Sequence, residues 1–204
     1  SVRNPKNPKH YFLSCSRSPE LVSDGDIMEF DLEGNSVDES KLRPYGERFI
    51  HGAILEARPE IQSVVHNHSL SVIPFGVTNT PLMPIIHTGA AIGRNIPIWD
   101  IHDNFGDTDL LVRNMEQGRD LAETMGNASV VLMRGHGCSV VGPSIKEATL
   151  TAVYLQISAA VQLQSMPLGN VRYLTPGETD ECTNMFYSDL SVDRAWENLT
   201  ARVK

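Results

Sequence analysis

The sequence predicts an α+β fold in which helices pack in layers against a largely antiparallel sheet. The expected strands come in groups of two or three rather than in regular strand–helix–strand units, which argues against a parallel sheet. One pair of strands flanks a tight turn, as in a hairpin. The chain has 204 residues, of which 41% are hydrophobic and 21% charged, so we expect residues 1–204 to form a single domain with one sizeable core.

The first half of the chain is expected to hold short strands and helices. Apolar and acidic residues alternate over 27–32, before the turn signal at 33–35, which is typical of a half-buried strand. Apolar residues recur at helical spacing over 47–57, and Pro59 ends that helix. The expected ranges are strands at 11–13, 27–32 and 61–66, with helices at 47–57 and 70–75.

The second half is expected to be richer in helix. Asp107 is a plausible N-cap for a helix over 108–125, and Pro143 and Ser144 open the longest helix, which runs to about residue 165. A tight turn at 134–137 joins the two strands of the hairpin. The remaining expected ranges are strands at 96–99, 130–133 and 139–141, with weaker helices at 179–186 and 193–203.

Charge and cysteine content exclude several classes of protein. The 17 Lys and Arg residues against 25 Asp and Glu give a net charge of −8, with no basic run. This argues against nucleic acid as a partner, because such binding depends on neutralising phosphates. No apolar stretch approaches the roughly 20 residues of a membrane span, so no membrane partner is expected. The 3 scattered cysteines are typical of a reduced, cytoplasmic protein.

The strongest chemical signal is the sequence His66-Asn67-His68 at the end of a predicted strand. Residues two apart in a strand point to the same face, with Cα atoms roughly 6.5 Å apart. Two imidazoles so placed can converge on one metal ion. Two polar histidines with no metal-binding role at a strand end would give the same sequence pattern, so the motif alone does not establish a metal site.

Two further residues can join this pair. His136 stands between glycines in the 134–137 turn, where backbone can approach a site closely, and a third imidazole would complete the set of three protein ligands typical of open metal sites. Glu47 begins the helix that precedes the strand of His66. If helix and strand pack antiparallel, its carboxylate lies beside the histidines. A solvent-exposed turn histidine and an ordinary first-turn glutamate are the alternatives.

The other candidates have simpler explanations. Asp107 and Asp109 fit the capped start of a helix better than an acidic metal site. His51 lies one turn into its helix, where a packing or orienting role is favoured over direct catalysis. His87 and His102 have no partners in the sequence, and each could line a pocket.

Taken together, these segments resemble the class II aldolase/adducin family. The resemblance is carried by residues 47–51, 57–60 and 64–68 and by the turn at 136–137, and it extends over nearly the whole chain. It implies that His66, His68 and His136 are metal ligands and that Glu47 is a ligand and the catalytic acid/base.

The resemblance also implies an architecture. The family fold is a three-layer α/β/α sandwich on an antiparallel sheet, so we expect the α+β fold of this chain to have these three layers. The family's usual assembly is a homotetramer with sites at the subunit interfaces. Against this family, residues 1–204 are expected to be one domain that lacks the family's N-terminal helices.

Two departures from the sugar-phosphate aldolases point to the substrate. Those aldolases hold phosphate with small hydroxyl residues, whereas the matching positions here carry Arg17 and Tyr45. An arginine can hold a planar carboxylate through two hydrogen bonds, so we expect Arg17 and Tyr45 to bind a small carboxylated substrate. With residues 26–30, 134–137 and 173–178, the chain looks closest to the family's aromatic-acid decarboxylase branch.

The sequence therefore predicts a metal-dependent carbon–carbon lyase. The favoured activity is decarboxylation of a hydroxylated aromatic or pyridine (di)carboxylic acid through a metal-stabilised enolate. The alternatives are an aldolase acting on a small hydroxy-oxo acid or sugar phosphate, an iron oxygenase of hydroxybenzoate-type substrates and, least favoured, a non-catalytic adducin-like module. We expect one divalent ion per subunit, Mn²⁺ first and Zn²⁺ next, with Fe²⁺ or Co²⁺ possible, because three imidazoles and a carboxylate suit all four ions.

Overall fold

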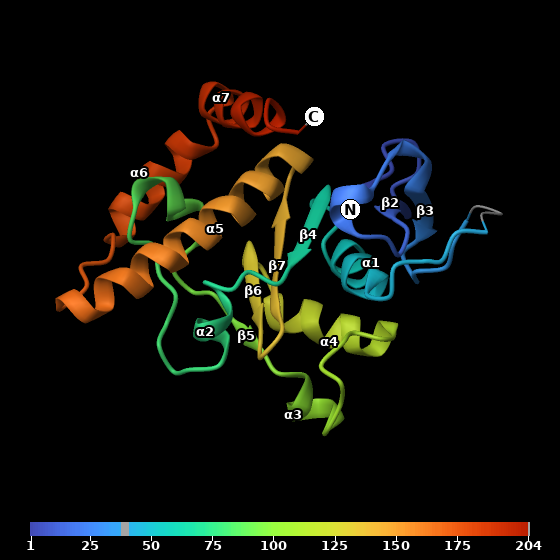
Figure 1. The fold of residues 1–204 in the computed structure, drawn as a ribbon, viewed down its shortest axis with the longest axis horizontal. Helices are drawn as coiled ribbons and strands as arrows, with labels where there is room; N and C mark the ends of the chain where they lie inside the picture. The colour runs from blue at the N-terminus through green and yellow to red at the C-terminus, as the bar shows by residue number, and fades with distance from the viewer. Residues whose placement is uncertain (38–40, 204) are drawn as a thin grey trace.

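The computed structural model describes residues 1–37 and 41–203, and it contains one sheet covered by helices on both faces (Figure 1). The strands are β1 (Val2–Arg3), β2 (His10–Ser14), β3 (Ile27–Asp31), β4 (Ser63–Asn67), β5 (Ile98–Trp99), β6 (Val130–Met133) and β7 (Gly137–Gly142). The α-helices are α1 (Arg48–Ala57), α2 (Ile73–Gly76), α3 (Ile101–Phe105), α4 (Met115–Met125), α5 (Ile145–Ser165), α6 (Pro176–Phe186) and α7 (Asp189–Thr200).

The sheet has seven strands in the order β3-β2-β1-β4-β7-β6-β5. Every neighbouring pair is antiparallel except β5 with β6, which is parallel. In the β4–β7 pair, His66 lies opposite Ser139 and Asn67 opposite Cys138. This register brings the end of β4 beside the start of β7, immediately after the β6–β7 turn.

Alternation along the central strands produces two apolar cores, one on each face. Val131 and Met133 of β6 join the core formed with α1 and α4, whereas Val130 and Leu132 join the core formed with α5 and α2. Residues two apart share a face of a strand, so one four-residue strand serves both layers. The predicted three-layer α+β sandwich on a mostly antiparallel sheet is therefore confirmed.

The helix that carries Glu47 at its N-terminus is held by close backbone packing. A Cβ added at Gly118 of α4 would lie 2.6 Å from the carbonyl oxygen of Phe49 in α1, so only glycine lets the two helices approach this closely. Gly52 of α1 is equally restricted by the carbonyl oxygen of Leu32. The start of α1 is thus fixed relative to the sheet edge and to α4.

The helix predicted over 108–125 begins later than expected. Asn114, not Asp107, is its N-cap and accepts a hydrogen bond from the Gln117 N–H. The preceding segment is an ordered loop in which Leu110 has a φ of 65°. The side chains of Thr108 and Asp109 accept hydrogen bonds from backbone N–H groups two residues on, and these local bonds compete with helix formation.

Smaller differences concern short elements. The sequence did not signal β1 or α3, which are 2 and 5 residues long, because so few residues carry no periodicity. The other expected elements are present with shifted ends. None of the helices in residues 1–37 and 41–203 is long and apolar enough to cross a membrane.

Candidate metal centre

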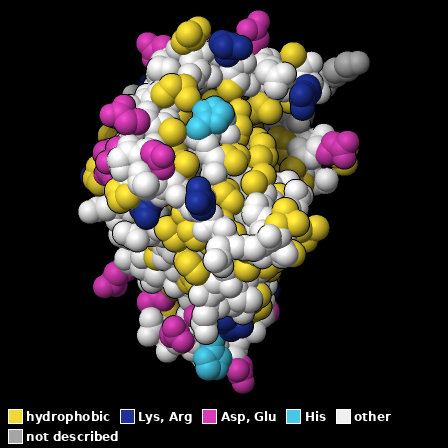
Figure 2. Space-filling view, turned by 90° about the vertical axis from the view of Figure 1, so that its left-hand side faces the viewer, with side chains coloured by type: hydrophobic (Ala, Val, Ile, Leu, Met, Phe, Trp, Pro, Cys, Tyr) yellow, Lys and Arg dark blue, Asp and Glu magenta, His cyan; other side chains and the backbone are white. Residues whose placement is uncertain are grey.

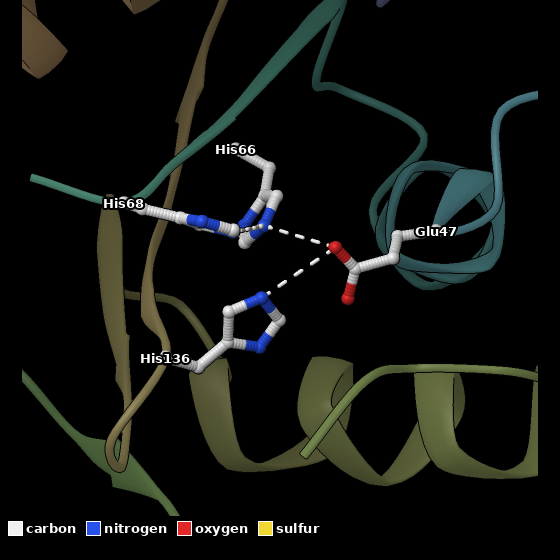
Figure 3. A group of neighbouring side chains, drawn as sticks. All are labelled: Glu47, His66, His68 and His136. Carbon is white, nitrogen blue, oxygen red and sulfur yellow. Dashed lines mark hydrogen bonds and ion pairs between the residues drawn. The ribbon is translucent and has the colours of Figure 1, made fainter. Parts of the chain in front are cut away.

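Glu47, His66, His68 and His136 meet at the end of the sheet, although they come from three separate segments (Figure 3). Glu47 is the N-cap of α1, His66 and His68 come from the end of β4, and His136 lies in the β6–β7 turn. One ligand atom from each residue can be chosen so that all four lie within 4.8 Å of one another. The helix and strand pack as the sequence predicts, with the start of α1 beside the end of β4.

The two histidines of the His66-Asn67-His68 segment do not share a strand face in the simple way expected. Of the two, only His66 lies within β4, which ends at Asn67. The Asn67 side chain accepts a hydrogen bond from the Ser69 N–H at 3.1 Å, which forms a local turn after the strand. The two Nε2 atoms nevertheless lie 3.1 Å apart, so the two rings converge although His68 lies outside the strand.

Gly137 is the reason that the turn can reach this segment. A Cβ at Gly137 would collide with the carbonyl oxygen of Asn67 and would lie 3.1 Å from the Cα of His68. The backbone of the turn therefore lies directly against the backbone of the two histidines. The ring of His136 is 5.0 Å from that of His66 and 4.6 Å from that of His68, measured between centroids.

Hydrogen bonding sets the orientation of His66. Its Nδ1 lies 3.1 Å from the carbonyl oxygen of Cys138, and a carbonyl can only accept, so Nδ1 carries the proton. The Nε2 lone pair is then free to face the cluster. This arrangement, in which one ring nitrogen is held by a carbonyl and the other faces the site, is typical of a metal-ligating histidine.

Glu47 presents an ionised carboxylate to the cluster. Burial alone would raise the pKa of Glu47, but the adjacent imidazole rings of His136 and His66 outweigh it and hold that pKa below its usual range. Its Oε2 lies 3.5 Å from Nε2 of both histidines. Its Oε1 accepts a hydrogen bond from the buried Val112 N–H at 3.2 Å, so the loop before α4 fixes the other oxygen.

The donor set fits a divalent cation. His136 is buried, and neither of its ring nitrogens has a hydrogen-bond partner among the described residues, a state that costs free energy unless another group satisfies them. Partial burial and the two neighbouring imidazoles lower the pKa of His68, which favours the neutral ring with a lone pair. Three imidazoles and one carboxylate are a ligand set that several divalent metals accept.

A pocket of about 220 Å³ opens beside His66 and is lined by the two predicted substrate-binding residues, Arg17 and Tyr45, and by His51. Burial, followed by the Glu47 carboxylate, raises the pKa of Tyr45, so its hydroxyl keeps its proton. Burial also lowers the pKa of His51 well below its usual value, so this ring is neutral. The pocket thus presents a cation, a hydroxyl and a neutral imidazole next to the four-residue cluster.

Arg17 already has one carboxylate partner within the chain. Its Nη1 donates to both oxygens of Asp26, at 3.0 and 2.9 Å, while its side chain remains 46% exposed. Hydrogen bonds from the hydroxyl and N–H of Ser23, and then from Arg17, lower the pKa of Asp26 to about 2. Only one nitrogen of the guanidinium takes part in this pair.

The remaining sequence candidates lie elsewhere. His87 lines a different cavity, with Tyr154 and Phe186. His102 is exposed, with its Nε2 3.6 Å from Asp107, so the Asp107–Asp109 segment does not join the four-residue cluster.

Several contacts that support the cluster carried no signal in the sequence. The Cys138 carbonyl and the Val112 N–H act through backbone atoms, which every residue type supplies. The partner of Arg17 is Asp26, nine residues along the chain, and only the pairing of β2 with β3 brings them together.

Comparison with known proteins identifies the family. The family described as Class II Aldolase and Adducin N-terminal domain matches residues 1–163. The chain belongs to this family. The resemblance read from the sequence is confirmed, and the family's fold is the one observed here.

Individual members of the family differ in how similar they are to this chain. The chain is 37% identical over 181 residues to the decarboxylase tropJ of Talaromyces stipitatus, a match that covers 82% of this chain and 68% of that protein. It is 28% identical over 189 residues to a 3,4-dihydroxyphthalate decarboxylase of Arthrobacter keyseri, covering 87% and 73%. An aldolase II superfamily protein from Pseudomonas syringae shares the fold, with a TM-score of 0.79, 19% identity and coverage of 99% and 81%.

These relatives settle the general class of the chain. The two relatives described above are named decarboxylases, and the family is that of the class II aldolases. The chain is therefore an enzyme of the lyase type, as the sequence predicts, rather than a non-catalytic module.

Replacing His66 and His68 together with Ala should abolish tight binding of divalent metal while leaving the fold intact. Two of the four donors are lost, and both side chains lie at a strand end rather than in either apolar core. Elemental analysis after dialysis, with circular dichroism as a check on folding, measures both outcomes. His102→Ala, which removes an exposed histidine, is the matched control and should retain full metal content. Full occupancy in the double variant would refute the assignment.

Proposed function

We propose that this enzyme decarboxylates a hydroxylated aromatic dicarboxylic acid in a divalent-metal-dependent reaction. The observation that carries the proposal is the convergence of Glu47, His66, His68 and His136 beside a pocket that contains Arg17. The named activities of the relatives support it: one is a decarboxylase, and another is a decarboxylase of 3,4-dihydroxyphthalate, an aromatic acid with two carboxylates and two hydroxyls.

The three histidines and Glu47 would hold the metal ion. We favour Mn²⁺, with Zn²⁺ next and Fe²⁺ or Co²⁺ possible, because the donor set suits all four and the resemblance to the aromatic-acid branch favours manganese. When bound, a divalent ion supplies Lewis-acid stabilisation of negative charge on substrate oxygens.

Glu47 is placed to move the proton that the reaction requires. Its carboxylate is ionised, so its Oε2 can accept the proton of the substrate's ring hydroxyl when the substrate binds. Loss of CO₂ leaves the bonding electron pair on the ring, and Glu47 returns the proton to that carbon. The ring oxygen regains a proton from water, so the carboxylate ends each cycle ionised.

Arg17 and Tyr45 would orient the carboxylate that is not lost. The Asp26 pair engages only Nη1 of Arg17, so the rest of the guanidinium can donate to a substrate carboxylate. Tyr45 keeps its proton and can donate a further hydrogen bond. Asp26 also offsets part of the positive charge of Arg17, which favours a singly charged carboxylate over a doubly charged phosphate at this site.

We further propose a cytoplasmic homotetramer with sites at the subunit interfaces, as the family resemblance implies. Large apolar side chains are exposed on α5, on α6 and between them, among them Ile157, Met166, Leu168 and Met185. Figure 2 shows hydrophobic side chains gathered over this side of the molecule, which favours coverage by another subunit. The free thiols of the 3 cysteines fit a reducing compartment.

The metal-loaded enzyme should release CO₂ from at least one hydroxylated aromatic dicarboxylic acid and should not cleave phosphorylated aldols. A panel of both substrate classes, with CO₂ and aldehyde followed in parallel, distinguishes the two lyase activities. Glu47→Gln keeps the shape of the side chain but cannot carry the proton, so we expect CO₂ release to fall by a factor of about 10² or more. Aldehyde release without CO₂ would make the enzyme an aldolase and refute the proposal.

Arg17→Lys should lower kcat/KM for the dicarboxylate by about tenfold or more, because a single ammonium cannot reproduce the planar fork. The loss of a charge-assisted hydrogen bond costs about 1.5–3 kcal/mol. Arg172→Lys, at an exposed arginine that does not line this pocket, is the matched control and should behave as the wild type. Wild-type kinetics for Arg17→Lys would mean that Arg17 serves only its pair with Asp26, since exposed ion pairs contribute about 0–1 kcal/mol.

Sedimentation velocity of the protein at micromolar concentration should show a species of four chains. A monomer under these conditions would contradict the proposed assembly.

A further inference from the structure

No hydrogen bond made by the ring of His136 explains how this ring is oriented. Glu47 is held by the Val112 N–H and His66 by the Cys138 carbonyl, each through the atom that points away from the cluster. Neither ring nitrogen of His136 has a hydrogen-bond partner among the described residues. The position of this ring therefore depends on the backbone of the turn at 134–137, which carries it.

That turn is tied at its first residue to the neighbouring strand. The Arg134 N–H donates to the carbonyl of Trp99 at 2.9 Å, and the Arg134 Nε–H donates to Oδ2 of Asp100. Two consecutive residues at the end of β5 thus accept hydrogen bonds from Arg134, one from its backbone N–H and one from its side chain. The rest of the turn closes through the His136 N–H, which donates to the Met133 carbonyl at 3.1 Å.

The partners of Arg134 are themselves fixed. The other oxygen of Asp100, Oδ1, accepts the His102 N–H at 2.9 Å and caps α3. The Trp99 Nε1–H donates to Asp120 of α4 at 2.6 Å. Arg134 is therefore bonded to a rigid corner formed by β5, α3 and α4, rather than to a freely moving surface acid.

We propose that Arg134 is a positioning residue for the metal centre, and that its ion pair with Asp100 holds the turn so that His136 faces Glu47, His66 and His68. This inference rests on the proposed metal-dependent function. It assigns a role to an arginine that contacts none of the four candidate ligands through its side chain.

The expected effects on stability and on metal affinity distinguish this positioning role from a merely structural one. The Arg134 and Asp100 side chains are 38% and 24% exposed, and an ion pair so accessible to solvent contributes little to the stability of the fold. A metal site, in contrast, requires its ligands to be held within about 0.5 Å, and partners that orient ligands affect metal affinity by a factor of about 10 to 100. Loss of the pair should therefore change metal binding far more than stability.

The direction in which the metal affinity changes also identifies the cause of the change. Removing a positive charge near a cation site would, by Coulomb's law alone, strengthen binding of the cation. Weaker binding after the loss of Arg134 must then come from geometry.

The test measures the Co²⁺ dissociation constant by calorimetry, the visible absorption spectrum of bound Co²⁺, and the melting temperature of the metal-free protein. For Arg134→Met we expect the dissociation constant to rise about tenfold or more, with an altered Co²⁺ spectrum and a nearly unchanged melting temperature. Arg134→Lys keeps a charge that can still pair with Asp100, so it should recover part of the loss.

Asp100→Asn gives an independent variant that retains the cap of α3, and it should weaken binding without adding to the effect of Arg134→Met when the two are combined. Arg119→Met is the matched control: it makes the same change of charge and breaks ion pairs with Glu33 and Glu56, away from the turn. It should bind Co²⁺ as the wild type does.

Wild-type affinity and spectrum in both Arg134→Met and Asp100→Asn would overturn the positioning role, as would an equal loss in Arg119→Met. Failure of the wild type itself to bind Co²⁺, or any other divalent metal, would instead refute the proposed function on which the inference rests.

Discussion

The candidate site depends on the close contact between the β6–β7 turn and the end of β4. Gly137 has no side chain, and this lets the turn lie against the backbone of Asn67 and His68. The β4–β7 register places this contact where β4 ends, and the start of α1 packs onto the same end of the sheet. Donors far apart in the sequence therefore converge on elements that both apolar cores hold in place.

The electrostatics of the site follow from this convergence. An ionised carboxylate and three imidazoles are brought together where Glu47 and His136 are buried and His68 is exposed, and buried polar groups without partners are costly. The imidazoles hold the pKa of Glu47 low, yet His136 keeps both nitrogens without hydrogen-bond partners in the described part of the chain. A divalent cation bound here would satisfy all four groups at once, which is why the arrangement favours a metal centre over a network of hydrogen bonds.

The sequence predicted the chemistry of the site better than its local geometry. Histidines two apart and a histidine between glycines are signals that depend on residue type, so His66, His68 and His136 could be named, and helix periodicity placed Glu47 at the start of α1. The local turn at Asn67 and the loop before α4 could not be foreseen, because side-chain hydrogen bonds to the backbone override periodicity there. The pairing of Arg17 with Asp26 required the register of β2 and β3.

The central claim is that three imidazoles and one carboxylate bind a single divalent ion. X-ray absorption spectroscopy of the protein loaded with one equivalent of Mn²⁺ or Co²⁺ tests it most directly, because imidazole rings produce a characteristic multiple-scattering pattern. We expect a fit with three histidine ligands and additional oxygen ligands for each metal ion. A spectrum that requires only oxygen ligands would contradict the account.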